Sequence, residues 1–323
     1  MPREMVHWLV AERAATLLAS GPFGPALSRC PNGLRLGAVY HDLLFYLRGE
    51  HPQALVELPH RLHGAKGEDT FELPRLYAAH MFAQRAQPLP TAFFVGLVAH
   101  IFADAILHPL VYFFTGNYYD ADPVRRSAAV RRHRTLEVLL DMVALGGLAG
   151  LEGRSLRVVV GALEGPLSLA CPPEITARLA GVDAPAAAKA QLAALDTYCT
   201  VQSLSRIQSL ARFVRELEGW LPAKARELAA LFYAPQLWDR RAAVEGPLSY
   251  RNPATGEQTN QTLAGLMELA ATHTARFCAS QAPGLTARGE LTATGPGPSL
   301  DMGLPGASTA RARHFSARIL PAD

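Results

Sequence analysis

The strongest constraint on the fold is an apolar segment from Phe93 to Phe114, which carries His100, Asp104 and His108 as its only residues charged near neutral pH. These three are spaced four residues apart, so on an α-helix they form one stripe. Burying two imidazoles and a carboxylate is costly unless a partner compensates for their lost hydration. Histidine and aspartate are zinc ligands, so the stripe favours a metal site on a buried helix.

The same segment is compatible with two other interpretations. About 20 apolar residues suffice to span a membrane, but an aspartate near the bilayer centre costs about 3 kcal/mol and Pro109 interrupts the helix. No second segment of this kind occurs, and no basic loop closely flanks either end. A buried network of polar groups that only bond to each other would explain any one of the three residues alone. Three residues on one stripe favour a metal.

Composition excludes some classes of protein. Hydrophobic residues make up 49% of the 323 residues, enough for a sizeable core in one large domain or two ordinary ones. The net charge of +3 is too small to indicate nucleic-acid binding, so no stable nucleic-acid complex is expected. The four cysteines are scattered without a CxxC pair, which is typical of thiols in a reducing compartment. The N-terminal segment lacks the unbroken apolar region of a signal peptide, which predicts a cytoplasmic location with at most peripheral membrane contact.

Helical periodicity dominates the chain. An apolar stripe predicts a helix over residues 3–19. Asp122 followed by Pro123 predicts the start of another helix, which runs to residue 145. The remaining expected helices cover 76–85, 185–218, 222–233 and 261–279, with a loop at 20–33 and a loop or short helices at 51–75. No run of residues is convincing as a strand, so the chain is predicted to be all-α.

The distribution of apolar residues also predicts the domain organisation. We expect residues 1–150 to form a metal-binding helical core and residues 151–282 to add helices that pack on the same domain. From residue 283 to 323 the chain is rich in Gly, Pro, Thr and Ala and has few large apolar residues. Such a composition buries too little surface to fold, so a disordered tail is predicted over 283–323.

Further candidate ligands lie outside the apolar segment. His133 and Glu137 are spaced i, i+4 on the 123–145 helix, where a surface ion pair is the alternative. Asp42 precedes a run of apolar residues, and a carboxylate there is either a helix cap, which is its more common role as a single residue, or a metal ligand. His7 lies on or beside the apolar stripe of the first helix, and His63 lies in an irregular polar segment.

In order and spacing, these residues resemble the zinc-dependent phospholipase C family, all-helical enzymes related to the fungal single-strand-specific nucleases. The matching segments are V-H-W-L-V-A-E, G-A-V-Y-H-D, R-L-H-G-A-K-G-E-D-T-F, G-L-V-A-H-I-F-A-D-A-I-L-H-P and H-R-T-L-E. They cover roughly the first 145 residues. H-x-x-x-D followed by H-x-x-x-E is the most specific part. The resemblance implies a multi-helix bundle with a zinc cluster between its helices.

The resemblance also implies a ligand set for two or three zinc ions. The first ion would be held by Asp42, His63, His100 and Asp104, with Asp104 bridging to a second. Another would be held by His108, His133 and Glu137, and His7 would bind the bridged ion. In the secreted relatives an N-terminal tryptophan also binds that ion. Here the sequence begins at Met1 and Trp8 lies within a helix, so a cluster of only two ions is the alternative.

The implied activity is hydrolysis of a phosphoric ester by metal-activated water, most similar to phospholipase C. Asp42 would act as general base as well as ligand. The substrate would be a phospholipid or another phosphodiester. Nearby aromatic residues would line its pocket or belong to the core, namely Tyr40, Phe45, Tyr46, Tyr112, Phe113 and Tyr118.

Two alternative functions remain open at this stage. An HD-type phosphohydrolase is suggested by the His41–Asp42 dyad with His7 upstream. That family leaves H-x-x-x-E unexplained, and the dyad is followed by Leu-Leu-Phe rather than its usual residues. The other alternative is a non-catalytic metal-binding or scaffold protein on the same fold.

Overall fold

The computed structural model describes residues 4–316 and 319. Within them, helices form most of the regular structure and a two-stranded hairpin is the single sheet, which confirms the all-α class. The first half comprises α1 (Glu4–Leu17), α2 (Gly24–Arg29), α3 (Pro31–Gly37), the 3₁₀ helix η1 (Tyr40–Tyr46), α4 (Gln53–Leu62), α5 (Glu72–Ala83), α6 (Pro88–Thr115) and α7 (Pro123–Ala144).

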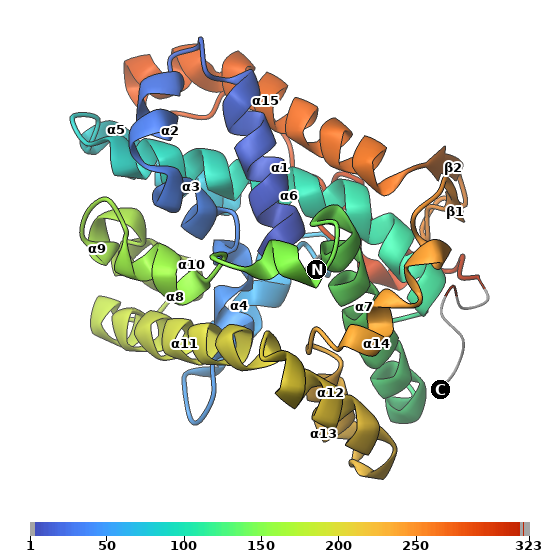
Figure 1. The fold of residues 1–323 in the computed structure, drawn as a ribbon. Coiled ribbons are helices and arrows are strands. Elements are labelled where there is room, and N and C mark those ends of the chain that lie inside the picture. Colours follow the sequence, from blue (N-terminus) through green and yellow to red (C-terminus); the bar gives the residue numbers. More distant parts are fainter. Residues whose placement is uncertain (1–3, 317–318, 320–323) are drawn as a thin grey trace.

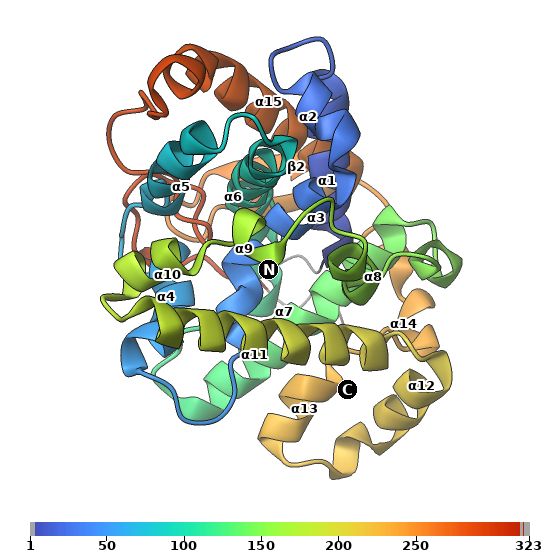
Figure 2. The same cartoon turned by 90° about the vertical axis from the view of Figure 1, so that its left-hand side faces the viewer.

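The second half consists mostly of short helices together with two long ones (Figure 2). Its elements are η2 (Leu148–Leu151), α8 (Leu156–Gly161), α9 (Leu167–Ala170), α10 (Pro173–Ala180), α11 (Ala184–Ser205), α12 (Gln208–Leu217), η3 (Glu218–Trp220), α13 (Ala223–Ala229), α14 (Pro235–Trp238), η4 (Arg241–Ala243), β1 (Leu248–Arg251), β2 (Gln258–Gln261), α15 (Leu263–Arg288) and η5 (Thr309–Arg311). The main hydrophobic cluster combines Trp8 and Phe93 with Tyr198 and Tyr233, so both halves contribute to one core.

Helix α6 is the central element of the fold (Figure 1). It is in contact with α1, α2, α3, α5, α7 and α15. Pro109 lies within α6 without ending it. Among the described helices, α6 alone is long and apolar enough to cross a membrane, and 89% of its most apolar window is buried inside the protein. The apolar surface of α6 is therefore buried in the core of the protein, which agrees with the prediction of a buried helix.

Helices α3 and α6 cross at two glycines. A Cβ atom at Gly37 would lie 2.1 Å from the carbonyl oxygen of Phe93, and one at Gly96 would lie 2.2 Å from that of Leu34. Only glycine permits so close an approach of two backbones. The crossing brings the carbonyl of Ala38, directly after α3, against the face of α6 that carries His100.

Several predicted boundaries differ from the structure. The expected loop at 20–33 contains α2 and the start of α3, each of which has a proline in its first turn, where proline is well tolerated. The segment 51–75, expected to be a loop or short helices, contains the short helix α4. Strands β1 and β2 pair antiparallel, Leu248 with Gln261, although no strand was expected. The Asn252 side chain accepts hydrogen bonds from the backbone of the connecting turn, which explains how so polar a segment forms a hairpin.

The prediction of a disordered tail is wrong for residues 283–316. Helix α15 continues through Pro283 to Arg288 and ends at Gly289, whose φ of +68° suits glycine. The following segment packs back onto the protein and buries Leu300, Met302 and Ala307. Its backbone donates from Leu300 to the His63 carbonyl and from Thr309 to the Ala65 carbonyl, both at 2.9 Å. Hydrogen bonds to distant backbone thus order a segment whose composition supplies few apolar contacts. Residues 317–318 and 320–323 lie outside the described residues.

Candidate metal centre

Three histidines of the site share one hydrogen-bonding pattern. Nδ1 of His100 bonds the carbonyl of Ala38 at 2.8 Å, Nδ1 of His108 that of Leu300 at 2.7 Å, and Nδ1 of His63 that of Pro59 at 2.6 Å. A carbonyl only accepts, so each Nδ1 must carry the proton. In the neutral ring, Nε2 then keeps its lone pair. In each ring Nε2 lies near carboxylates, which is the orientation that a metal ligand needs.

The first cluster consists of Asp42, His63, His100 and Asp104, whose potential ligand atoms lie within 4.8 Å of one another. Nε2 of His63 is 3.2 Å from Oδ1 of Asp42, and Nε2 of His100 is 3.1 Å from Oδ2 of Asp104. All four side chains are buried. They come from η1, the end of α4 and the middle of α6, so three segments distant in sequence meet here.

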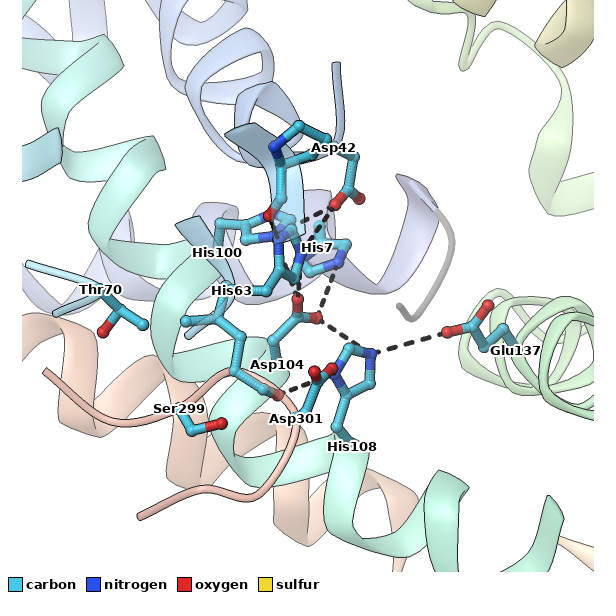
Figure 3. Close-up of polar contacts among 12 residues, drawn as sticks. His7, Asp42, His63, Thr70, His100, Asp104, His108, Glu137, Ser299 and Asp301 are labelled. Atoms are coloured by element: carbon cyan, nitrogen blue, oxygen red, sulfur yellow. Dashed lines mark hydrogen bonds and ion pairs between the residues drawn. The ribbon is translucent and has the colours of Figure 1, made fainter. Parts of the chain in front are cut away.

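The second cluster consists of His108, His133 and Glu137, with ligand atoms again within 4.8 Å of one another. Nε2 of His133 lies 2.9 Å from Oε1 of Glu137, and the same oxygen is 3.7 Å from Nε2 of His108. The pair at i, i+4 on α7 therefore faces inward toward α6 and is not a surface ion pair. Figure 3 shows Glu137 approaching His108 from the neighbouring helix.

Asp104 connects the two clusters (Figure 3). Its Oδ2 faces His100 and His63, whereas its Oδ1 lies 3.6 Å from Nε2 of His108 and 3.3 Å from Nε2 of His7. His7 also stacks on His100, with ring centroids 4.2 Å apart. His7 is thus brought to the bridging carboxylate, although its ring belongs to neither compact group. The structure brings together all eight residues that the sequence singled out.

The donor atoms of the site fit a metal ion. Among the described residues, Oδ1 of Asp42, Nε2 of His100, both carboxylate oxygens of Asp104 and Nε2 of His108 are buried without a hydrogen bond. Buried polar atoms rarely stay unbonded, because their lost hydration is not compensated. Imidazole nitrogens and carboxylate oxygens suit Zn²⁺. Both clusters therefore fit zinc.

The charges of the site favour a proton on one histidine in the absence of metal. Burial alone lowers the pKa of His100, but the carboxylates of Asp104 and Asp42 outweigh it and raise that pKa to about 9. Burial also opposes the charge of Asp104, yet the imidazoles of His108, His100 and His7 hold its pKa well below the usual range. Burial lowers the pKa of His108 and His133 well below 6.5. The metal-free centre therefore pairs an Asp104 carboxylate with a His100 imidazolium.

Helix α1 is held at the site by Asp141 of α7. The backbone N–H groups of Met5 and Val6 donate to the Asp141 carboxylate at 3.1 Å and 2.9 Å, and the Tyr233 hydroxyl donates to it at 2.7 Å. The first N–H groups of a helix have no partner within the helix, and a carboxylate there also interacts favourably with the helix dipole. Asp141 therefore fixes the start of α1 and, one turn on, the position of His7.

A cavity of about 120 Å³ opens onto the clusters. Asp42, His63, His108, His133 and Glu137 line it. The aromatic residues in its wall are Phe45, Tyr46, Tyr112, Tyr118, Tyr119 and Tyr198, and its cationic residues are Arg48 and Arg134. Of the aromatic residues expected to form a pocket, Tyr40 and Phe113 do not line this cavity. The Tyr40 hydroxyl instead lies 2.9 Å from that of Thr176 in the core.

His41 does not join either cluster, contrary to what an HD-type site would require. Its ring stacks on His100, with centroids 4.6 Å apart and planes 11° apart. Neither compact group of potential ligand atoms includes His41. The residue after it, Asp42, points into the first cluster.

Sequence reasoning missed one acidic residue of the site, Asp301. Its carboxylate lines the cavity and lies 3.6 Å from Nδ1 of His108. The hydroxyls of Tyr112 and Tyr119 donate to it at 2.9 Å and 3.0 Å. Burial raises the pKa of Asp301. No periodicity or motif marks this residue, because it lies in a segment of low hydrophobicity far along the chain from its partners.

Comparison with known proteins agrees with the motifs. Residues 6–163 match a family described as zinc dependent phospholipase C, which confirms the resemblance. The matched range includes all eight predicted ligands. No match was found among curated proteins or among solved structures.

Proposed function

Because residues 6–163 of this chain belong to the zinc-dependent phospholipase C family, we propose that the protein is a zinc-dependent phosphodiester hydrolase of the phospholipase C type. The observation that carries the proposal is the carboxylate of Asp104 between two buried clusters, with one oxygen facing each. That arrangement suits two ions a few ångströms apart, which is the spacing used for in-line displacement at phosphorus.

We propose one zinc ion in each cluster. Asp42, His63, His100 and Asp104 would hold the first, and His108, His133, Glu137 and Asp104 the second. His7 offers a further nitrogen beside the Asp104 oxygen that faces the second cluster, so a third ion or a further ligand for the second would be accommodated there. Zinc bound at these positions would lower the pKa of a water molecule and offset negative charge that develops on the phosphoryl group.

Asp42 is the proposed general base. It belongs to the first cluster and also lines the cavity, so its carboxylate is accessible to a water molecule that attacks a bound phosphodiester. Its Oδ1 faces the first cluster, 3.2 Å from Nε2 of His63, so the other oxygen of the carboxylate would take the proton. No serine or cysteine nucleophile is needed in this scheme.

The cavity wall supports a phosphodiester with an apolar or aromatic substituent. Arg48 and Arg134 supply positive charge for the phosphate. Phe45, Leu228 and Leu231 supply apolar surface beside them. We propose a phospholipid as the substrate. A nucleotide diester is the alternative substrate, and a direct assay distinguishes the two.

The proposal is tested with purified protein loaded with Zn²⁺. Hydrolysis is measured on bis(p-nitrophenyl) phosphate, on phosphatidylcholine and phosphatidylglycerol vesicles, and on a dinucleotide. We expect diester cleavage that a strong chelator abolishes and added Zn²⁺ restores, with phosphocholine or glycerol phosphate released from the vesicles. Zinc bound at both clusters without cleavage of any of these diesters would instead indicate a non-catalytic metal-binding protein.

A further inference from the structure

The loop 298–305 lies against the metal centre, although it falls outside residues 6–163. It is closed by a bridge between Pro298 and Pro305 and by hydrogen bonds from Ser299 N to Leu304 O at 2.9 Å and from Gly303 N to Ser299 O at 2.8 Å. Figure 3 shows Ser299 and Asp301 on this loop beside His108. The loop therefore has a defined shape that presents its inner residues to α6.

The backbone of Leu300 bonds to both clusters at once. Its N–H donates to the carbonyl of His63 at 2.9 Å, and its carbonyl accepts from Nδ1 of His108 at 2.7 Å. The Leu300 side chain is fully buried, packed in a cluster with Phe71 and Ile101. This one residue thus fixes the backbone that carries His63 and the tautomer of His108.

Asp301 adds a carboxylate on the far side of the His108 ring from the second cluster. Its Oδ1 lies 3.6 Å from Nδ1 of His108. The residue is 3% exposed, and its carboxylate accepts hydrogen bonds from the hydroxyls of Tyr112 and Tyr119. Two hydroxyl donors thus hold this carboxylate in place where it faces the N–H edge of the His108 imidazole.

We propose that Asp301 is a positioning residue of the metal centre, and that with the Leu300 carbonyl it orients His108 and strengthens it as a zinc ligand. The Leu300 carbonyl is hydrogen-bonded behind the imidazole and fixes its orientation, and the Asp301 carboxylate, 3.6 Å from the same nitrogen, raises the basicity of the ring through its charge. Losing a partner behind a ligating imidazole typically lowers metal affinity about 10- to 100-fold. The inference rests on the proposed zinc function, and it assigns part of the site to a segment beyond the family match.

The primary test is the Asp301→Asn variant, which keeps the shape of the side chain and removes its charge. Zinc affinity is measured by competition with a chromogenic chelator, and the ligand field at the second cluster by the visible spectrum of Co²⁺-loaded protein. We expect weaker binding of one of two ions by about 10-fold or more, and an altered Co²⁺ band. Asp196→Asn, at a carboxylate with 78% side-chain exposure, is the matched control.

A double-mutant cycle separates a role through His108 from a general structural role. In the His108→Ala background, Asp301→Asn should weaken zinc binding no further than about two-fold, because the ring through which it acts is gone. If the losses of zinc affinity caused by the two substitutions added together, the positioning role of Asp301 would be overturned. Wild-type zinc affinity and an unchanged Co²⁺ spectrum in Asp301→Asn would overturn it as well.

A second variant tests the loop itself. Gly303 has a φ of +72°, and a Cβ there would lie 2.4 Å from the carbonyl oxygen of Ala105 on α6, so Gly303→Ala must push the loop away. Gly295→Ala imposes a similar positive φ of +84° in open space and serves as control. We expect only Gly303→Ala to weaken zinc binding, and equal effects would overturn the role of the loop.

The outcomes also separate this inference from the proposed function. Zinc bound by the wild type and weakened by Asp301→Asn, without hydrolysis of any diester, would refute only the hydrolase. Hydrolysis with zinc affinity unaffected by Asp301→Asn would refute only the positioning role. A wild type that binds no zinc would refute both.

Discussion

Oδ1 of Asp104 lies 3.6 Å from Nε2 of His108, one helical turn further along α6. The other oxygen of the same carboxylate lies 3.1 Å from Nε2 of His100, one turn earlier. Spacing by four residues on one helix therefore places a single carboxylate between two histidines that belong to different clusters.

Loss of the shared carboxylate should affect both metal sites. Asp104→Asn removes one anionic ligand from each cluster, so we expect zinc content to fall from two ions per chain to below one. Glu137→Gln removes a ligand from the second cluster only and should leave about one ion. His51→Ala, at a histidine bonded to the Arg48 carbonyl, should keep both. Metal analysis of dialysed protein gives these contents, and an Asp104→Asn variant with full zinc content would contradict the bridging role.

Zinc binding should release a proton from His100. The pKa of His100 without metal is about 9, above its ordinary value of 6.5, so this ring is protonated at pH 7.5 and must lose its proton to bind zinc. Apparent affinity should therefore rise with pH up to about 9. Calorimetric titration at pH 7.5 in two buffers of different ionisation enthalpy counts the protons. We expect the release of about one proton. Binding enthalpies that do not depend on the buffer would exclude proton release from His100.

Asp42 should contribute more to turnover than to substrate binding. With zinc present in excess, Asp42→Asn is expected to lower kcat by about 10²- to 10⁴-fold, the range typical of a general base, with little change in KM. Steady-state kinetics on bis(p-nitrophenyl) phosphate measures both constants. Tyr198→Phe removes a hydroxyl from the wall of the same cavity without removing a proposed ligand, and as the control it is expected to retain kcat. An Asp42→Asn variant with wild-type kcat would exclude the assigned role.

The crossing of α3 and α6 should be intolerant of a single methyl group. A Cβ at Gly96 would lie 2.2 Å from the Leu34 carbonyl, so we expect Gly96→Ala to lower the free energy of unfolding by about 1–3 kcal/mol. The shift would also move the Ala38 carbonyl from His100 and weaken zinc binding. Chemical denaturation of metal-free protein measures the first effect and zinc competition the second.

Gly161→Ala is the matched control for that crossing. Gly161 ends helix α8, and a Cβ there meets no atom within 4 Å. The substitution should leave stability unchanged or raise it by about 0.4–1 kcal/mol, because alanine restricts the unfolded chain. Equal losses in the two variants would mean that the close approach of α3 and α6 is not what requires Gly96.

Local signals in the sequence were sufficient for the helical class and for some of the residues that meet at the clusters. Spacing by four residues placed His100, Asp104 and His108 on one face of α6, and Asp122 caps α7 as expected. The family resemblance indicated that the remaining residues of the two clusters are ligands as well. The inward orientation of His133 and Glu137 depends on how α7 packs on α6, which no local pattern specifies.

The parts that sequence reasoning missed depend on contacts between distant segments. Asp141 bonds the start of α1 across more than 130 residues, and Asp301 reaches His108 from the far end of the chain. The segment 290–316 has too few apolar residues to predict order, yet it is held by backbone hydrogen bonds such as that of Leu300 to His63. The composition of a segment indicates how much apolar surface it can bury. It does not indicate which backbone groups the segment will hydrogen-bond to after folding.

The central claim is that both buried clusters hold zinc and share Asp104. Anomalous diffraction from crystals of zinc-loaded protein, recorded above and below the zinc absorption edge, locates the ions directly. We predict one peak among Asp42, His63 and His100 and a second among His108, His133 and Glu137, with Asp104 between them. A structure in which neither cluster shows a zinc peak, or in which the zinc lies elsewhere on the protein, would contradict the claim.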